Sequence, residues 1–268
     1  EFRKMMLESK HIKYLVDFVD SKDCFADVSI NSGACYFLID RDYKGLTHYE
    51  TTEDGRTSSS LRDLNEFEIF IRRNEAVSII HKVRKLQEKT LDADGGCSPQ
   101  TPFGLLSTYE GKPLRDSDED LEYYSSKGWS FVDRNVVKKS IPLIDQFKPM
   151  ISKLTSEHAG NPDNNGQYRV LSKMLILEPK QICSQSYLTI GGFDNYEEAL
   201  NLFDYLRTKF VRFLILQTLA GMNLSINNFR FVPWLDFTKK WTDEGLYAKY
   251  NLSEEEIRFI ESMIRPMD

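Results

Sequence analysis

The amino-acid sequence predicts an α/β protein, and three observations lead to this fold class. Apolar residues recur every three or four positions across residues 193–222, which is the spacing of the buried face of a long helix. Short apolar runs at residues 12–19 and 34–39 have the length and composition of buried strands. Turn residues separate these segments along the chain. We therefore expect strands and helices to share a substantial core.

The first third of the chain predicts paired strands between two helices. The expected elements are the end of a helix over residues 3–10, strands over 12–19 and 34–39, a hairpin with strands 46–50 and 57–61, a short strand over 68–72 and a helix begun by Asn74. Glu53-Asp54-Gly55 supplies the hairpin turn, because an Asp-Gly pair adopts the backbone that tight hairpins need. Asn74 suits a helix start because its side chain can accept a hydrogen bond from the first turn.

Residues 90–124 predict an exposed loop or flap. They contain Gly95-Gly96, Pro99 and Pro102, and they end in the acidic run 116–122. The elements expected after this segment are strands over 147–154, 171–177, 186–190 and 229–232, and short helices begun by Thr242 and Ser253.

The long helix over 193–222 has predicted ends and a polar side. Asp194 or Asn195 can cap its start, and Gly221 can end it in a left-handed conformation. Lys209 and Arg212 lie three positions apart on its polar side. They either contact phosphate or are the solvated surface of a core helix.

The composition is that of a folded protein without a membrane span. Of the 268 residues, 41% are hydrophobic and 28% are charged, which excludes wholesale disorder. No apolar run reaches the roughly 20 residues of a membrane helix, so we expect a cytoplasmic protein without a membrane partner. The net charge of -6 argues against indiscriminate coating of nucleic acid, although a local basic face is compatible with it. The chain does not begin with methionine, which predicts a piece of a longer protein.

Motifs for cofactor, metal or nucleophilic chemistry are absent from the sequence. Residues 190–193 (IGGF) lie between a strand and a helix, but they are too short for a dinucleotide-binding turn. The four cysteines and four histidines are dispersed without a CxxC pair, so we expect structural thiols and no metal site.

One short pattern suggests a different enzyme class. Asp163 follows Pro162, and Glu178 and Lys180 follow an apolar run, which matches the PD...ExK arrangement of metal-dependent nucleases. In such an enzyme the two carboxylates hold Mg²⁺ and the lysine orients the attacking water. Pro179 weakens the match, because a proline removes a backbone donor where the strand should present both side chains. A chance match and a Mg²⁺-dependent nuclease are the two interpretations.

Three long stretches resemble a known enzyme family. They are KHIKYLVDFVDSKDCFADVSINSGACYFLIDRD, SQSYLTIGGFDNYEEALNLFDYLRTKFVRFLILQ and FRFVPWLDFTKKWTDEGLYAKYNLSEEEIRFIESMIRPM. Together they resemble the C-terminal part of adenine-N6 DNA methyltransferases of type II restriction-modification systems, the EcoRI-methylase-like group and its fused restriction and methylation relatives. The stretches cover roughly two-fifths of the chain, which is far more specific than a short motif.

The resemblance implies how the chain is divided. Residues 1–89 would be the end of the methyltransferase catalytic domain with a connecting hairpin, a remnant of its sheet. Residues 90–268 would be a mixed α/β target-recognition domain. The family's S-adenosylmethionine loop and its catalytic Asn/Asp-Pro-Pro-aromatic motif lie upstream of the first stretch, and neither occurs here. We therefore expect no cofactor and no catalytic residue in this fragment, with S-adenosylmethionine bound by the parent enzyme.

The resemblance also implies partners and site residues. The partners would be double-stranded DNA and the missing N-terminal catalytic region of the same protein. Phe25 falls where similar enzymes place an aromatic that packs on the flipped adenine, whereas its alternative role is that of an ordinary core residue. The candidate DNA contacts are Arg56, Arg62, Lys148, Ser152, Lys153, Lys209 and Arg212, with Ser58, Ser59 and Ser60 as further donors.

Two further alternatives follow from the residues. Trp129, Trp234 and Trp241 could stack on a base, but burial is the expectation for all three. The acidic segment and the negative net charge suggest that the chain could instead be a protein-interaction module.

Overall fold

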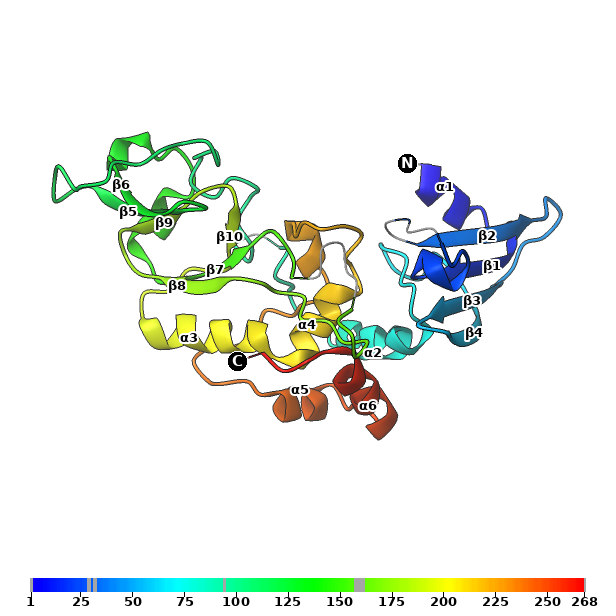
Figure 1. Ribbon diagram of the computed structural model, residues 1–268. Coiled ribbons are helices and arrows are strands. Elements are labelled where there is room, and N and C mark those ends of the chain that lie inside the picture. The colour runs from blue at the N-terminus through cyan, green and yellow to red at the C-terminus, as the bar shows by residue number, and fades with distance from the viewer. Residues whose placement is uncertain (1, 28–29, 31–32, 94, 157–161, 268) are drawn as a thin grey trace.

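A computed structural model describes residues 2–27, 30, 33–93, 95–156 and 162–267 of the chain. It is a mixed α/β structure, as the sequence predicts. Figure 1 shows two β-rich lobes joined by a base of helices. Among the described residues, no helix is long and apolar enough to cross a membrane.

The N-terminal lobe is a four-stranded sheet that follows helix α1 (Phe2–Glu8). Its strands are β1 (Ile12–Phe18), β2 (Ala34–Ile39), β3 (Thr47–Glu53) and β4 (Arg56–Arg62), in the order β2-β1-β3-β4. β1 pairs parallel with β3 and antiparallel with β2, and β3 and β4 form the predicted hairpin. The strands and the hairpin of this lobe are thus confirmed. A 3₁₀ helix, η1 (Ser21–Asp23), follows β1.

The next two elements differ from the sequence prediction. Residues 68–72 form no strand; the Ile71 carbonyl instead accepts a hydrogen bond of 3.0 Å from the Arg62 guanidinium. Helix α2 (Asn74–Lys85) includes Asn74, so the preceding Arg73 occupies the cap position. Asn74 points to the hairpin and accepts a hydrogen bond of 2.6 Å from the Ser60 hydroxyl.

The second lobe is a pair of three-stranded sheets. One contains β5 (Leu121–Ser125), β6 (Gly128–Val132) and β9 (Gln181–Cys183) in the order β6-β5-β9; the other contains β7 (Lys148–Ser152), β8 (Met174–Leu177) and β10 (Tyr187–Thr189) in the order β10-β7-β8. A core that includes Tyr123, Met150 and Leu177 fills the space between them. The 3₁₀ helices η2 (Arg134–Val136) and η3 (Ile141–Asp145) connect β6 to β7. The strands predicted over 147–154, 171–177 and 186–190 are confirmed, with shorter bounds.

The prediction of an exposed flap over residues 90–124 is wrong in part. Leu91, Phe103 and Leu105 are buried, and β5 begins at Leu121. The exposed portion is the stretch from 106 to 119, where the chain is rich in turns. The glycines and prolines therefore marked irregular backbone correctly, but irregular backbone is not the same as an exposed loop.

The predicted single helix over 193–222 is two helices, α3 (Tyr196–Arg207) and α4 (Lys209–Leu216). Thr208 separates them with a ψ of 150°, and its side chain accepts a hydrogen bond from the Val211 amide to cap α4. The Asp243 carboxylate accepts further hydrogen bonds from the Lys209 and Phe210 amides, at 3.0 and 2.8 Å. The second helix ends at Leu216, so Gly221 is not its cap.

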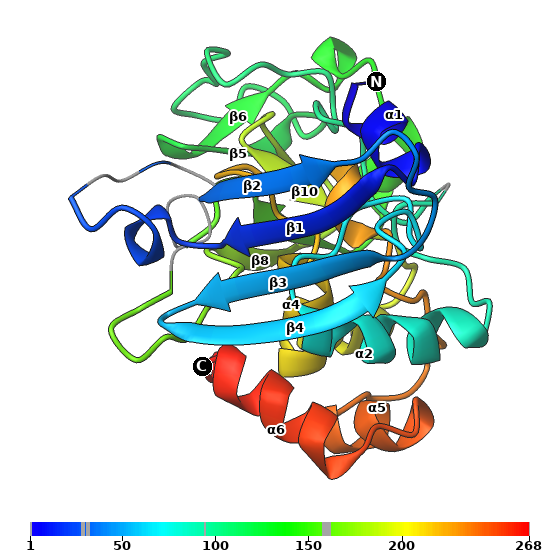
Figure 2. The same ribbon diagram turned by 90° about the vertical axis from the view of Figure 1, so that its right-hand side faces the viewer.

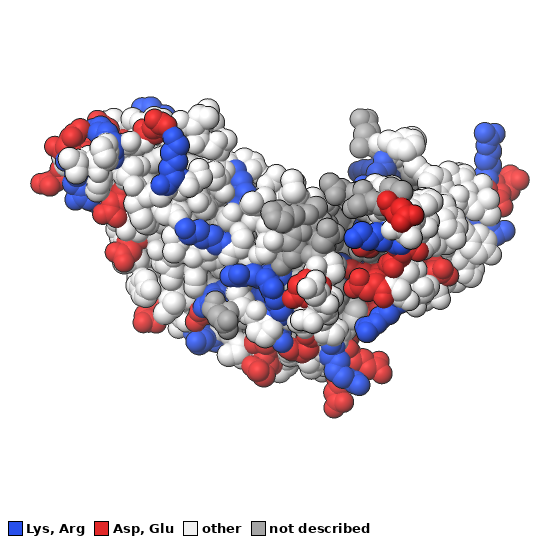
Figure 3. All heavy atoms as spheres, viewed as in Figure 1, with Lys and Arg blue, Asp and Glu red and all other residues white. Residues whose placement is uncertain are grey.

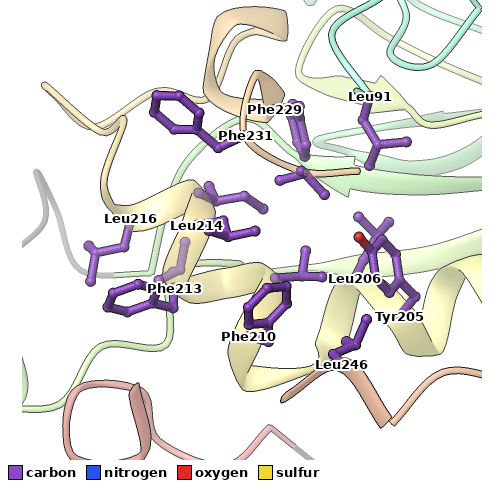
Figure 4. Packing of buried hydrophobic residues seen from close by; sticks show 14 of the residues in the cluster. Leu91, Tyr205, Leu206, Phe210, Phe213, Leu214, Leu216, Phe229, Phe231 and Leu246 are labelled. Atoms are coloured by element: carbon purple, nitrogen blue, oxygen red, sulfur yellow. The ribbon is translucent and has the colours of Figure 1, made fainter. Parts of the chain in front are cut away.

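The helices form the base of the molecule. α4 packs against α5 (Asp243–Lys249) and α6 (Glu254–Met263), which begin after Thr242 and Ser253 as predicted. Figure 4 shows the aromatic centre of this core, to which α4 contributes Phe210 and Phe213 and the segment after it contributes Phe229. That segment forms a 3₁₀ helix, η4 (Ile226–Phe229), where a strand over 229–232 was expected.

The hydrophobic clusters show where the lobes meet. A small cluster under the N-terminal sheet contains Ile12, Leu15, Tyr49 and Leu64. The large cluster of the helical base begins with Phe67 and includes the buried face of α2. Along the chain, buried side chains therefore pass from the small cluster to the large cluster before α2. The domain boundary at residue 89 stays a prediction.

Candidate functional site

One group of polar and cationic side chains lies across an end of the β10-β7-β8 sheet. The Ser152 amide donates to the Lys173 carbonyl at 2.8 Å, and the Lys153 amide donates to the Ser186 carbonyl at 3.0 Å. Backbone pairing thus places Lys173, at the start of β8, beside the end of β7, and Ser186 beside it on the other side. We call Ser152, Lys153, Lys173 and Ser186 the sheet-end row.

The two ammonium groups of the sheet-end row have neutral partners. Lys153 donates to the Gln100 carbonyl, and Lys173 donates to the Tyr124 hydroxyl. Among the described residues, neither ammonium lies within salt-bridge distance of a carboxylate. Partial burial lowers the pKa of Lys153. In a chain of net charge -6, two such lysines are a local positive site.

Aromatic rings border the sheet-end row. The Lys173 ammonium lies 4.7 Å from the centre of the Tyr124 ring, at the distance of a cation–π contact. The Tyr124 ring is 5.3 Å from Tyr187 and 4.8 Å from Trp129, between ring centres. Trp129 is 50% exposed, so the expectation that it is buried is wrong. The Lys173 ammonium and these rings therefore lie side by side, where they could bind a phosphate and a flat ring, and the backbone of the row continues from Lys173 through Ser152 to Lys153.

Figure 3 shows Lys and Arg side chains gathered in the left-centre of the viewed face, while acidic side chains dominate its lower right. The strands of the sheet-end row belong to the lobe on the left of the same view in Figure 1. The negative net charge of the chain is therefore unevenly distributed over its surface.

Lys148, which was expected to contact DNA, is instead fully buried. Its ammonium donates to three carbonyl oxygens, of Ile144, Gln146 and Glu178, at 3.3, 2.9 and 3.1 Å. Burial without a carboxylate partner lowers the pKa of Lys148 to about 7. These contacts hold the turn before β7 and the turn after β8 together, so Lys148 has a structural role in this conformation.

The cationic side chains of α4 are also engaged in the fold. Arg212 is 1% exposed, and its guanidinium donates to the carbonyls of Arg169 and Arg265 at 3.1 and 2.9 Å. Lys209 forms an ion pair with Glu261 of α6. Arg212 was interpreted either as solvated surface or as a phosphate contact. Neither interpretation fits, because its guanidinium joins buried segments.

The arginines of the hairpin have different surroundings. Arg62 is buried, with an ion pair of 2.5 Å to Glu66 and its guanidinium 5.4 Å from the centre of the Tyr49 ring. Arg56 is exposed and lines a cavity of about 440 Å³ together with Ser58 and Asp163. Glu53, Asp54 and Glu75 also line this cavity, which makes it acidic. Of the seven predicted DNA contacts, only Ser152 and Lys153 belong to the sheet-end row, and both are partly exposed.

Phe25 lies just after η1 and is 50% exposed. Its amide donates to the Ser21 carbonyl at 2.7 Å, which closes the turn that positions the ring. Exposure removes the alternative that Phe25 is a core residue. Its contact with a flipped adenine stays a prediction.

The residues of the nuclease pattern do not converge. Asp163 accepts hydrogen bonds within its own loop and lies 3.4 Å from Arg265. Glu178 and Lys180 occupy the turn from β8 to β9, where the Lys180 ammonium donates to the Asp118 carbonyl. In the part of the chain that the structure describes, no group of three acidic, histidine or cysteine side chains could hold a metal. The match in sequence is therefore not supported by a site.

Sequence reasoning missed Lys173, and it named Trp129 as a possible stacking residue but expected it to be buried. Lys173 precedes a strand and joins the surface only through the register between β7 and β8. Trp129 is placed beside Tyr124 by the register between β5 and β6, and the sequence interpretation took its aromatic character as a sign of burial. A local pattern carries no information on either pairing.

Comparison with known proteins gives one relationship. No family model matches the chain. The chain is 32% identical over 87 residues to an "Uncharacterized adenine-specific methylase" of Mycoplasma pneumoniae, a match that covers 32% of this chain and 21% of that protein. The chain thus spans about a fifth of the length of this curated relative. The likeness supports a relationship to adenine-specific methylases, without identifying a particular group of them.

Proposed function

We propose that this chain selects the DNA sequence on which a parent adenine-N6 methyltransferase of a restriction-modification system acts. The observation that carries the proposal is the sheet-end row, where two ammonium groups without carboxylate partners lie beside short hydroxyl donors in an otherwise acidic chain. The likeness to an adenine-specific methylase supplies the chemistry that such recognition would serve. S-adenosylmethionine would be bound elsewhere in the parent enzyme.

The sheet-end row suits a nucleic-acid backbone because of its donors. Lysines and serines are common partners of DNA phosphates, and such contacts fix the register of a protein on the duplex. On binding, Lys153 would replace the Gln100 carbonyl by a phosphate oxygen, and Lys173 would replace the Tyr124 hydroxyl by one. A phosphate oxygen is the stronger partner because the hydrogen bond is then charge-assisted. Base-specific contacts would then come from neighbouring side chains of the same lobe. Phe25, in the other lobe, would be the stacking partner of the target adenine.

The N-terminal sheet supports the proposed partnership with a catalytic region. β2 is an edge strand, and Tyr36, Phe37, Leu38 and Ile39 on it are all exposed although they alternate between both faces. Leu38, Tyr14, His48 and Leu61 are neighbours in successive strands and form an exposed row across the outer face. A strand that is apolar on both faces is typical of the interior of a larger sheet. The missing catalytic sheet would continue this one at β2.

The test is binding of the chain to a pool of randomised short duplexes, measured by fluorescence anisotropy at increasing salt. Affinity should fall with a log-log slope of about -0.9 per neutralised phosphate. The double variant Lys153→Ala/Lys173→Ala should bind at least about tenfold more weakly and lose about 1.8 from the slope, because two phosphate contacts are removed.

The matched control is Lys239→Ala/Lys240→Ala, which removes the same charge from an exposed segment before α5. This control should keep the slope of the unchanged protein. Equal losses in both double variants would show that binding follows net charge alone, and the proposed surface would then be wrong. Failure of every duplex to bind at low salt would overturn DNA recognition and favour the protein-interaction alternative.

A further inference from the structure

Trp129 is the most exposed ring of the aromatic group beside the sheet-end row. It follows Gly128, which begins β6 with a φ of +102° after the tight turn from β5. That conformation is natural only for glycine, so the turn fixes where the strand starts and on which face the next side chain lies. The indole therefore projects from a hairpin of defined geometry.

One side of the indole is supported from within the lobe. Tyr124 lies opposite Trp129 in the β5–β6 pair, and the ring planes meet at 59° with centres 4.8 Å apart. Tyr124 is itself packed on Tyr187 and approached by the Lys173 ammonium. Buried partners thus restrain the indole on one side, while half of its surface faces solvent.

The charge around the indole favours a nucleotide over an apolar peptide. Lys173 links the aromatic group to the sheet-end row, because its ammonium lies over Tyr124 while its carbonyl accepts from the Ser152 amide. The side chains of an apolar peptide would offer no anionic acceptor to either ammonium group. A nucleotide has a flat ring for the indole and a phosphate for the lysines, in one covalent unit.

On the basis of the proposed function, we propose that Trp129 stacks on an unstacked base of the bound DNA while Lys153 and Lys173 bind the flanking phosphates. A paired base inside a duplex offers only its edges to a protein, whereas an unstacked base offers its face. The site would therefore take a base that is unpaired or displaced from the duplex. This base is distinct from the target adenine assigned to Phe25.

The experiment compares two short duplexes of one sequence, one fully paired and one with a single 2-aminopurine left unpaired as a bulge. Anisotropy should show tighter binding of the bulged duplex by about fivefold or more, which is the lower range for stacking of one base. The 2-aminopurine fluorescence should be quenched in the complex, because an indole stacked on the base quenches it.

Two variants test the role of the ring. Trp129→Ala should lose the quenching and the preference for the bulge, so that it binds the bulged and the paired duplex with equal affinity. Trp129→Phe retains a ring and should keep most of the preference, which separates stacking from a loss of local structure. Circular dichroism of both variants shows whether the lobe is intact.

The outcomes separate this inference from the proposed function. Lysine-dependent binding of the paired duplex without any preference for the bulge would overturn the stacking site and leave DNA recognition standing. A preference that survives in Trp129→Ala would place the base elsewhere and would also overturn the inference. Absence of binding to either duplex would overturn both proposals.

Discussion

The two regions of the molecule bury their apolar side chains in very different ways. In the helical base and the second lobe, residues such as Phe213 on α4 and Met150 on β7 are inaccessible to solvent. In the N-terminal sheet, Leu38 on β2 is 51% exposed and Tyr36 is 61% exposed, on a face that Figure 2 shows uncovered by any helix. The first region is complete in itself. The N-terminal sheet has the apolar composition of a sheet that is covered on this face, yet the face is exposed to solvent.

This difference in burial is not matched by a difference in strand composition, because the exposed strand is also apolar. In an antiparallel sheet with one solvent-exposed face, apolar and polar residues alternate along each strand. The run from Tyr36 to Ile39 is instead apolar without interruption. β4, at the other edge, has the short polar run Thr57 to Ser60 before Leu61 and is bordered by α2. The two edges of the sheet are therefore suited to different neighbours, and among the described residues it is the β4 edge that has a helix beside it.

The largest contrast should appear when an apolar side chain is removed from each region. Phe213→Ala should reduce the free energy of unfolding by roughly 3–5 kcal/mol, because it leaves a cavity where Phe213 meets Phe259 at 5.8 Å between ring centres. Leu38→Thr should change it by less than about 0.5 kcal/mol, because the side chain is already half in water. Urea unfolding followed by circular dichroism measures both. Similar losses in the two variants would mean that the β2 face is covered in the free chain.

A smaller effect is expected at the joint between the regions. Arg73 is buried, with an ion pair of 2.5 Å to Glu53 on β3 and its guanidinium over the Tyr168 ring. Arg73→Met should destabilise the protein by roughly 2 kcal/mol, below the usual range for a buried pair because the Glu53 side chain keeps 21% of its surface exposed.

Hydrogen exchange would locate the effect of Arg73→Met. The amides of β3 and β4 should lose protection more than those of α4, since the pair attaches the sheet to the base. The control is Lys4→Ala, which removes an exposed pair on α1 and should cost less than about 0.5 kcal/mol. Equal loss of protection in the sheet and in α4 would show that the two regions unfold as one unit.

The last effect appears only as a change of stability with pH, and it tests whether water is excluded from the second lobe. Burial lowers the pKa of Lys148 to about 7, so between this value and the unfolded pKa of about 10.4 the unfolded chain binds one more proton than the folded chain. The contribution of Lys148 to stability should therefore improve as the pH rises through that window, by at most about 1.4 kcal/mol per pH unit.

Comparison with Lys148→Met isolates the contribution of Lys148 to the pH dependence of stability, because the two proteins share all other titrating groups. The difference in unfolding free energy between the two proteins should shift in favour of the lysine protein between about pH 7 and about pH 9, and stay constant below about pH 6. Parallel curves over the whole range would show that water reaches the Lys148 ammonium.

Sequence patterns predicted those parts of the fold that depend on neighbours in the chain. β1 and β2 are short apolar runs, the β3–β4 hairpin follows from Asp54-Gly55, and α6 begins with the capping box of Ser253 and Glu256. Each signal is contained within a few residues, so it is readable without the fold.

The errors arose where a distant residue decides the local structure. The break between α3 and α4 depends on Asp243, which lies 34 positions from Lys209 and satisfies amides that a continuous helix would have used. Residues 229–232 were expected to form a strand because they are apolar, but Phe229 and Phe231 are buried in a helical core, and the Val232 carbonyl accepts one hydrogen bond from the Leu91 amide without forming a described sheet.

The candidate site was predictable only in part for the same reason. Ser152 and Lys153 were found as polar residues at the end of a strand, whereas Lys148 five positions earlier was placed with them although it points inward. The direction of a lysine depends on the sheet and on the carbonyls that surround it. Lys173 and Trp129 join the surface through strand pairing, which no single segment records.

The break at Thr208 has a consequence for how the core is assembled. α3 lies against the β10-β7-β8 sheet, and α4 lies against α5 and α6, so a single residue marks the change from one packing environment to the other. Because Thr208 and Asp243 supply the α4 cap, the amides that begin α4 are satisfied without a preceding turn of helix. The chain therefore changes direction inside one continuous core, to which both helices contribute buried side chains.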